Sequence, residues 1–396
     1  MNHTVVRWAR ETAGLTLVQA AHALGLPSTD RLQRIEDGEE PPSRPLLLKM
    51  CKTYRRSLLT FYLSAPPRKS DSGQDFRTLP PDRTVADDAL LDALMRDITA
   101  RQNMVRSIVV DEEEGQALPF IGSATIQTQA ASLANSIATR LGARLDEYRA
   151  KHSSGQAFAY LREKAEAQGI FVLLIGNLGN HHSTISLETF RGFAIADRFA
   201  PFIVINDQDS KTAWSFTLLH ELAHLWLGQS GVSGTNTEQA VERFCNEVAA
   251  AFLLPQAELA ALTLPVDQSD EQWMDFLTLY CLERHLSRKM VAYGLLRAGR
   301  IVRSTWLRLD LALDRQWQVN HAHEREQARS RNGKPSFYVV RRHRLGSALL
   351  SLVDRTLGAG TLTPVKAAKL LGVKPRSVHP LLLDRPTGGQ SLRSGA

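Results

Sequence analysis

The chain has 396 residues, of which 43% are hydrophobic and 22% are charged, the composition of a globular protein with roughly two to four domains. No apolar run is long enough for a membrane span, no signal peptide is predicted, and the scattered Cys51, Cys245 and Cys281 argue against a disulfide framework. These features favour a cytoplasmic protein, and the net charge of +7 is compatible with nucleic-acid binding without indicating it.

Residues 1–66 are predicted to form a bundle of short helices. The segment TLVQAAHALG begins with Thr16 and Gln19 at the spacing of a capping box, and Gly25 ends it. Pro27 lies in the following turn, after which STDRLQRIEDG predicts a further helix. Two short helices joined by a tight turn are typical of a helix-turn-helix, whose second helix can lie in a major groove of DNA.

The middle of the chain changes character twice. Residues 67–85 are rich in proline, serine and charge and predict a linker, whereas residues 86–150 predict a helical connecting region. After Gly169 the short runs GIFVLLIG, FRGFAIAD and APFIVIND are rich in β-formers and separated by turn residues, which predicts a small sheet. We therefore expect a mainly α fold with a small mixed β-sheet.

The segment FTLLHELAHLWLG places three ionisable side chains on an otherwise apolar helix that Gly228 caps. His220 and His224 are four residues apart, so they share a helix face and can offer two imidazole nitrogens to one ion. Neutral imidazole suits Zn²⁺, and a catalytic zinc site has three protein ligands. Glu221 lies one residue further round, where it can accept a proton from water without ligating the metal.

A third ligand is expected on the downstream helix TNTEQAVERFCNEVAAAFLLP, which Pro255 ends. Glu242 and Glu247 are the two candidates, and their five-residue spacing puts them on different faces. We favour Glu242 because its face is apolar apart from Asn246, one turn later, which can orient a ligating side chain. A surface ion pair on the face of Arg243 explains Glu247.

One alternative keeps the metal but removes the catalysis. Cys245 is one turn from Glu242 and could be the fourth ligand of a closed structural zinc site. Plain core packing is the more common role of a cysteine on a buried helix face. A closed site would also leave Glu221 without a purpose.

The segments SFTLLHELAHLWLG and VERFCNEVAAAFLLP, preceded by FRGFAIADRFAPFIVIND, closely resemble the ImmA/IrrE metallopeptidases. The resemblance implies a zincin-like (gluzincin-type) α+β domain in which His220, His224 and Glu242 bind zinc and Glu221 is the general base. Asn246 falls on the asparagine of the family's E-x-x-x-N-x-x-A-A pattern. The N-terminal segment WARETAGLTLVQAAHALG resembles an XRE-type helix-turn-helix, which is commonly fused ahead of such peptidases.

The helix-turn-helix suggests specific DNA contacts and also raises an objection to them. Four residues fall at the starts and on the outer faces of its two helices, and we predict DNA contacts at Gln19, Thr29, Arg31 and Gln33. An acidic cluster of Glu36, Asp37, Glu39 and Glu40 flanks the second helix and is unfavourable beside phosphates. A dimerisation or partner-docking module is therefore kept as the alternative.

The domain organisation that follows has five parts. They are a helix-turn-helix at 1–66, a linker at 67–85, a helical connection at 86–150, an ImmA/IrrE-like metallopeptidase domain at 151–310 and a helical basic region at 311–396. The resemblance implies a zinc endopeptidase that cleaves a specific regulator or repressor in a stress, phage or mobile-element response. The alternative is a DNA-binding regulator or antitoxin that binds a cognate toxin with little proteolysis. DNA, a protein partner and a homodimer are the expected associations, without a membrane.

Four further features have open interpretations. The strand PFIVIND could act as a sheet edge that holds an extended peptide, and His181, His182 and Arg191 are candidates for oxyanion stabilisation. The C-terminal segment TPVKAAKLLGVKPRSVHPLL could form a second helix-turn-helix-like unit or a small structural bundle. The nearby Arg341, Arg342 and Arg344 could contact nucleic acid or an acidic partner, or form a solvated basic face.

Overall fold

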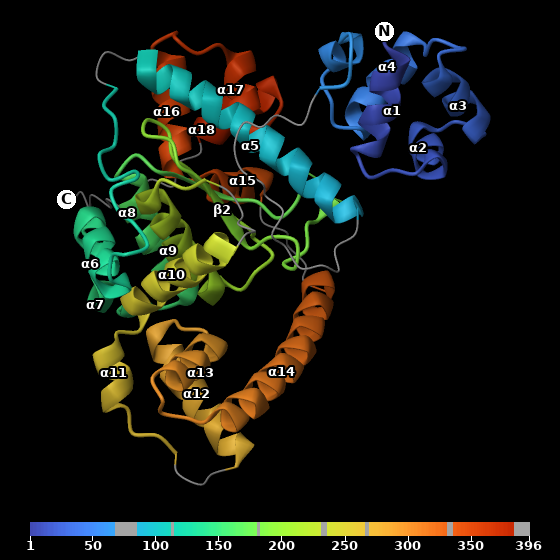
Figure 1. The fold of residues 1–396 in the computed structure, drawn as a ribbon. Coiled ribbons are helices and arrows are strands. Elements are labelled where there is room, and N and C mark those ends of the chain that lie inside the picture. Colours follow the sequence, from blue (N-terminus) through green and yellow to red (C-terminus); the bar gives the residue numbers. More distant parts are fainter. Residues whose placement is uncertain are drawn as a thin grey trace, which may run out of the picture. The chain divides into compact units, whose positions relative to one another are not determined.

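The computed structural model describes residues 1–67, 85–111, 115–179, 183–230, 236–265, 269–330 and 336–383 (Figure 1). The predicted linker at 67–85, His181, His182 and the start of the predicted second metal-site helix at Thr235 lie largely outside this description. Two compact units are present: residues 1–100 with 176–191 and 231–239, and residues 101–175 with 192–230 and 240–396.

The N-terminal module consists of α1 (His3–Glu11), α2 (Leu17–Leu24), α3 (Thr29–Asp37), α4 (Arg44–Thr53) and the 3-10 helix η1 (Leu58–Tyr62). The predicted capping box is present, because the Thr16 hydroxyl accepts from the Gln19 backbone N–H while the Gln19 side chain accepts from that of Thr16. Gly25 ends α2 in the left-handed conformation, as predicted. The helices enclose one apolar core of Val6, Leu24, Leu32, Ile35, Met50, Tyr54 and Phe61, among others.

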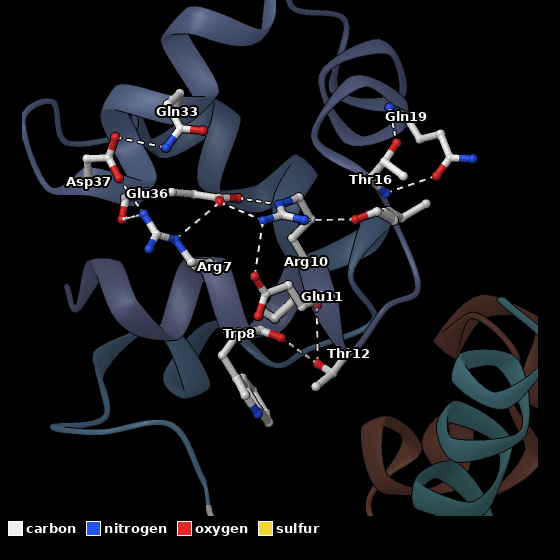
Figure 2. A network of polar contacts seen from close by, with 12 residues as sticks. Arg7, Trp8, Arg10, Glu11, Thr12, Thr16, Gln19, Gln33, Glu36 and Asp37 are labelled. Carbon is white, nitrogen blue, oxygen red and sulfur yellow. Dashed lines mark hydrogen bonds and ion pairs between the residues drawn. The ribbon is translucent and has the colours of Figure 1, made fainter. Parts of the chain in front are cut away.

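A buried ion pair connects the first and third helices of this module (Figure 2). Arg10 donates from Nε to Glu36 Oε1 at 2.7 Å and from Nη2 to Oε2 at 2.9 Å, and its Nη1 donates to the Leu15 carbonyl at 2.9 Å. The Glu36 side chain is 1% exposed. Bidentate arginine–carboxylate pairs are both strong and directional, so this pair fixes the angle between α1 and α3.

The second unit is built around a three-stranded mixed sheet, and all three predicted β-rich runs supply a strand. β1 (Phe171–Leu174) pairs in parallel with β3 (Phe202–Ile205), and β2 (Gly192–Ile195) pairs antiparallel with the other side of β3. The order β1-β3-β2 makes β3 the central strand. The prediction that PFIVIND forms a sheet edge was therefore wrong, because this strand, β3, is hydrogen-bonded to a neighbouring strand on each side. β2, which begins directly after Arg191, is an edge strand.

Helices cover this sheet and extend the unit. The helical connection contains α5 (Val85–Asp111), of which only the residues from Arg101 belong to this unit, together with α6 (Ala130–Leu141) and α7 (Leu145–Arg149). α8 (Ser154–Glu166) packs against β1 and α9, and α9 (Lys211–Leu227) packs against β2 and β3 (Figure 1). α10 (Asn236–Leu253) follows, then α11 (Gln256–Ala261), α12 (Asp270–Arg284), α13 (Arg288–Arg297) and the long α14 (Arg303–Ser330). No described helix has the length and apolar composition of a membrane span.

The C-terminal helices are α15 (Phe337–Leu345), α16 (Ser347–Gly358), α17 (Pro364–Leu371), η3 (Pro375–Ser377) and α18 (Val378–Leu383). A buried Arg162–Glu166 pair at the end of α8 attaches them to the sheet. Glu166 accepts from the Ser347 backbone N–H at 2.8 Å, and Arg162 donates to the Val172 carbonyl of β1 and to the His343 carbonyl of α15. The carboxylate thus supplies the cap that Gly346, without a side chain, cannot give to α16.

Glycine is required at position 346 for two reasons. Its φ of 79° lies in the region that favours glycine. A Cβ there would also lie 2.0 Å from Glu166 Oε1, 2.6 Å from Arg162 Nη2 and 2.9 Å from the Val172 carbonyl oxygen. The chain can therefore pass the buried ion pair only without a side chain.

We predict that Glu36→Gln destabilises the N-terminal module by about 3 kcal/mol, because Arg10 keeps its buried charge and loses its counter-ion. Hydrogen–deuterium exchange of the full chain should show amides of α1 and α3 exchanging about a hundredfold faster. Glu39→Gln is the matched control, since Glu39 is an exposed acid in the same turn region. Equal exchange in the two variants would show that the pair contributes nothing.

Candidate metal centre

The candidate site is centred on one turn of α9. Ser210 caps the start of this helix and Gly228 ends it in the left-handed conformation, as predicted. Nearly every side chain of the last three turns is buried, including Leu218, Leu222 and Leu225. α9 is therefore a core helix, and any polar group on it must find a partner within the protein.

Three predicted ligands converge here. His220 Nε2 lies 3.2 Å from Glu242 Oε2, His224 Nε2 lies 3.1 Å from Glu242 Oε1, and the two Nε2 atoms are 3.1 Å apart. Ligands bound to one zinc at 2.0–2.1 Å in a tetrahedron lie about 3.3 Å from one another. The spacing and the N, N, O donor set both fit a zinc ion.

The hydrogen bond of Asn246 strengthens this interpretation. Its Oδ1 lies 3.0 Å from His220 Nδ1, so that ring nitrogen can donate its proton to the amide. A neutral His220 then turns the lone pair of Nε2 toward the Glu242 carboxylate and His224. Converging lone pairs repel unless a proton or a metal ion lies between them. Asn246 thus orients the His220 ring, and its role beside a metal ligand stays a prediction.

Solvent reaches the three ligands from one side. The His224 side chain is 3% exposed, that of His220 12% and that of Glu242 36%. Burial raises the pKa of the Glu242 carboxyl, but the adjacent imidazoles of His220 and His224 lower it by more, so the net shift is downward. The acid is therefore held as a carboxylate, the form that ligates metal.

Glu221 lies beside the cluster without belonging to it. Its side chain is buried, and burial raises the pKa of its carboxyl while the neighbouring His220 and His224 lower it, with a net rise. A carboxyl whose pKa is raised is a better proton acceptor during hydrolysis.

The three ligand residues form the only group of His, Cys, Asp and Glu with metal-binding spacing among the described residues.

The rejected candidates have other contacts. Glu247 pairs with Arg297 at 2.6 Å, so its partner is on α13 and not the Arg243 face that the sequence suggested. Cys245 is fully buried in the apolar core and lies outside the described metal-binding group, as expected for core packing. All three cysteines are free thiols.

Sequence reasoning missed Gly192 and Thr217, which bound the site on the sheet side. A Cβ at Gly192 would lie 2.5 Å from Thr217 Cγ2, 2.9 Å from Glu221 Oε1 and 3.2 Å from the Val204 carbonyl oxygen. The backbone of β2 at Gly192 therefore lies too close to Glu221 and Thr217 to leave room for a side chain. The glycine within FRGFAIAD was the available signal, since a glycine in a strand often marks the close approach of another group to the backbone.

The four predicted DNA-contact residues all lie in the N-terminal module, and three of them are bonded internally. Gln19 Oε1 accepts from the Thr16 N–H at 2.9 Å, and Gln33 Nε2 donates to Asp37 at 2.8 Å (Figure 2). Arg31 Nε donates to Glu40 at 2.9 Å. Thr29 is half-buried at the start of α3. The capping bond of Gln19 uses only the oxygen of its amide.

The acidic cluster that flanks α3 serves mainly internal contacts. Glu36 is buried against Arg10, Asp37 accepts from Arg7, and Glu40 accepts from Arg31 and from Arg34. The hydrogen bond from Arg31 lowers the pKa of the Glu40 carboxyl, partly opposed by burial. The cluster thus neutralises cations of the same surface.

Two protein families match the chain. A family described as the IrrE N-terminal-like domain (peptidase M78) matches residues 165–284, which include α9, α10 and the whole sheet. A helix-turn-helix domain matches residues 4–59. No curated protein and no solved structure matches. The chain thus joins a helix-turn-helix domain to a metallopeptidase-type IrrE N-terminal-like domain, the architecture of the ImmA/IrrE proteins.

Proposed function

We propose that the chain is a zinc-dependent endopeptidase that cleaves a specific regulator or repressor protein, and that its helix-turn-helix brings it to DNA. The convergence of His220, His224 and Glu242 beside the buried Glu221 supports this proposal most directly. The regulatory substrate and the stress, phage or mobile-element setting come from the family resemblance. The cytoplasmic location stays a prediction from the sequence.

The ligand set would hold zinc through His220 Nε2, His224 Nε2 and the Glu242 carboxylate. When bound there, zinc would supply a Lewis acid that polarises the scissile carbonyl and acidifies water. The role of Asn246 is to keep the His220 ring oriented through its Nδ1.

Glu221 performs the proton transfers. Its carboxylate accepts a proton from water as the water oxygen forms a bond to the carbonyl carbon. The same carboxyl then donates that proton to the amide nitrogen as the C–N bond breaks, releasing an acid and an amine. Burial of Glu221 raises the pKa of its carboxyl, which makes the carboxylate a stronger acceptor for the proton of water.

The edge strand β2 is the part of the sheet best placed to bind substrate. Among the described residues β3 is its one strand partner, and Gly192 at its start lies against Glu221. An extended peptide that adds to this edge by backbone hydrogen bonds would bring its own backbone near the proton acceptor. We place the substrate here, in place of the central strand that the sequence suggested.

In the alternative, the chain is a DNA-binding regulator or antitoxin that binds a toxin. Both hypotheses include the DNA-binding module, but in the alternative the metal site does not hydrolyse peptides. A protein that only binds a toxin has no use for a buried Glu221 next to three converging ligands. Peptide hydrolysis is therefore the function that the site supports best.

We predict that the wild-type chain binds about one zinc ion per chain and cleaves a peptide library with labelled termini. Glu221→Gln should keep the zinc and lose at least about a hundredfold in cleavage, because only the proton acceptor is removed. Glu242→Ala should lose both zinc and cleavage. Zinc content by elemental analysis and cleavage by mass spectrometry give the two readouts.

Glu247→Ala is the matched control for these variants. It removes an acid from the same helix, paired with Arg297 and away from the ligands, and should keep both properties. Zinc retention by Glu242→Ala would contradict the ligand assignment. Zinc binding by wild type without hydrolysis of any peptide would favour the toxin-binding alternative.

We predict that Gly192→Ala abolishes most cleavage while zinc content stays unchanged. The added methyl group meets Thr217 and Glu221, so the proton acceptor is displaced whereas the three ligands keep their places. Gly358→Ala is the control, since a Cβ at that helical position meets nothing within 4 Å. Full activity of Gly192→Ala would show that β2 does not position Glu221.

For the N-terminal module we predict that Glu40→Gln strengthens binding to duplex DNA by about three- to tenfold at about 100 mM salt. The substitution removes one negative charge and releases Arg31 and Arg34 for phosphates. Glu39→Gln removes the same charge without breaking a pair and should have a smaller effect. Fluorescence anisotropy with a labelled duplex measures both, and equal effects would rule out release of the arginines as the cause.

A further inference from the structure

A sequence pattern of the N-terminal helix-turn-helix occurs a second time in the C-terminal helices. Residues 16–25 and residues 363–372 both follow T-x-V-x-A-A-x-x-L-G. In both copies the threonine caps the helix by accepting from the N–H three residues later, at 3.2 Å from Gln19 and 3.4 Å from Lys366. The family match to a helix-turn-helix covers the first copy only.

The two copies also agree in burial and in the way the helix ends. Alanines 20 and 21 are buried in the first copy, and Ala367 and Ala368 take their places in the second. Gly25 and Gly372 both end their helix in the left-handed conformation, with φ of 70° and 58°. A short turn and a further helical segment follow each glycine, and α17 packs against η3 and α18 as α2 packs against α3.

Several arginines of this region are used to build it. Arg341 donates from Nε and Nη2 to the Leu371 carbonyl at 3.0 and 2.6 Å, and Arg101 donates to the Leu370 carbonyl at 3.3 Å. These guanidinium groups satisfy the carbonyls at the end of α17. Arg344 pairs with Asp207 at 2.6 Å. The basic residues that the sequence suggested for nucleic acid thus include structural ones.

Four further cations are exposed and lie on α17 and in the segment after it. They form what we call the C-terminal basic face, made of Lys366, Lys369, Lys374 and Arg376. Lys366 and Lys369 are three residues apart and share one exposed side of α17, opposite the buried alanines. Lys374 and Arg376 follow in the turn and in η3.

This face differs from the first copy in its charge balance. Residues 337–383 contain eight Lys and Arg and one Asp, a formal surplus of seven positive charges that equals the net charge of the whole chain. No Asp or Glu occurs from Arg355 to Leu383. The four cations of the face form no ion pair with any part of the chain that the structure describes. On α3, in contrast, Arg31 and Arg34 share Glu40.

We propose that the C-terminal basic face binds the phosphate backbone of duplex DNA, as a second DNA contact of the chain. A helix-turn-helix lays its first helix across the backbone, which is where Lys366 and Lys369 would lie. Unpaired cations on such a scaffold release counterions when they neutralise phosphates. The surface goes beyond the proposed peptidase function and does not depend on the metal.

The contact adds affinity without reading sequence. No Asn or Gln occurs from Ala359 to Leu383, so the side chains that pair bidentately with adenine are missing. The helix after the turn is short and contains Pro380. Lysines bind phosphate as point charges, so the face positions the protein on DNA whatever the base sequence.

The test uses the full chain and a labelled 20-base-pair duplex of arbitrary sequence in anisotropy titrations between about 50 and 200 mM KCl. We expect K366E/K369E and K374E/R376E each to weaken binding at least about tenfold near 100 mM salt and to reduce the salt slope by about two. The loss should be the same for unrelated duplex sequences, because phosphates alone are contacted.

The matched control is R303E/R315E on α14, which reverses two exposed cations and makes the same change in formal charge. It should change binding by less than about threefold. Circular dichroism and zinc content check that each variant is folded, and K366A/K369A replaces K366E/K369E if that variant is not. Unchanged binding in the lysine variants, or an equal loss in the control, overturns the proposal. A loss for single-stranded RNA with none for the duplex overturns the assignment to DNA.

Discussion

The burial of three ionisable side chains on one turn of a core helix is the constraint on which this structure depends. His220, Glu221 and His224 lie where an apolar helix packs against the sheet, and unpaired polar groups there would be costly. α10 supplies polar partners for the two histidines: Glu242 contacts both rings, and Asn246 contacts His220. β2 begins with a glycine, and any side chain at this position would collide with Glu221. The polar turn of α9 thus constrains both α10, which must supply its hydrogen-bond partners, and β2, which must leave room for Glu221.

The parts of this arrangement that depend on local periodicity were predictable from the sequence. The four-residue spacing of the two histidines, the glycine caps and the apolar face around Glu242 all follow from helix geometry. The three strands were also recognisable as runs of β-formers. Their order was not, because a sequence does not state which strand pairs on both sides, and the central β3 was taken for an edge.

Contacts between distant residues account for the other differences. Glu247 finds Arg297 fifty positions away, so a face argument within α10 named the wrong partner. In the N-terminal module, Gln19, Gln33 and Arg31 were chosen as outward-facing residues, and each also bonds within its own domain. The net charge did not indicate which basic residues are available to bind a partner. The structure shows that Arg341 donates to the Leu371 carbonyl at the end of α17, whereas Lys366 is exposed to solvent.

The pair of Arg162 and Glu166 has a consequence for what counts as the smallest independent part of this protein. Strand β1, the end of α8 and the start of α16 all make hydrogen bonds to these two side chains. The predicted boundary at residue 310 separates the sequence into a peptidase segment and a tail, yet removal of the tail would uncover a buried carboxylate and guanidinium and leave both short of partners. The C-terminal helices are therefore part of the structural support of the sheet, and we expect that the segment before residue 310 does not fold stably without them.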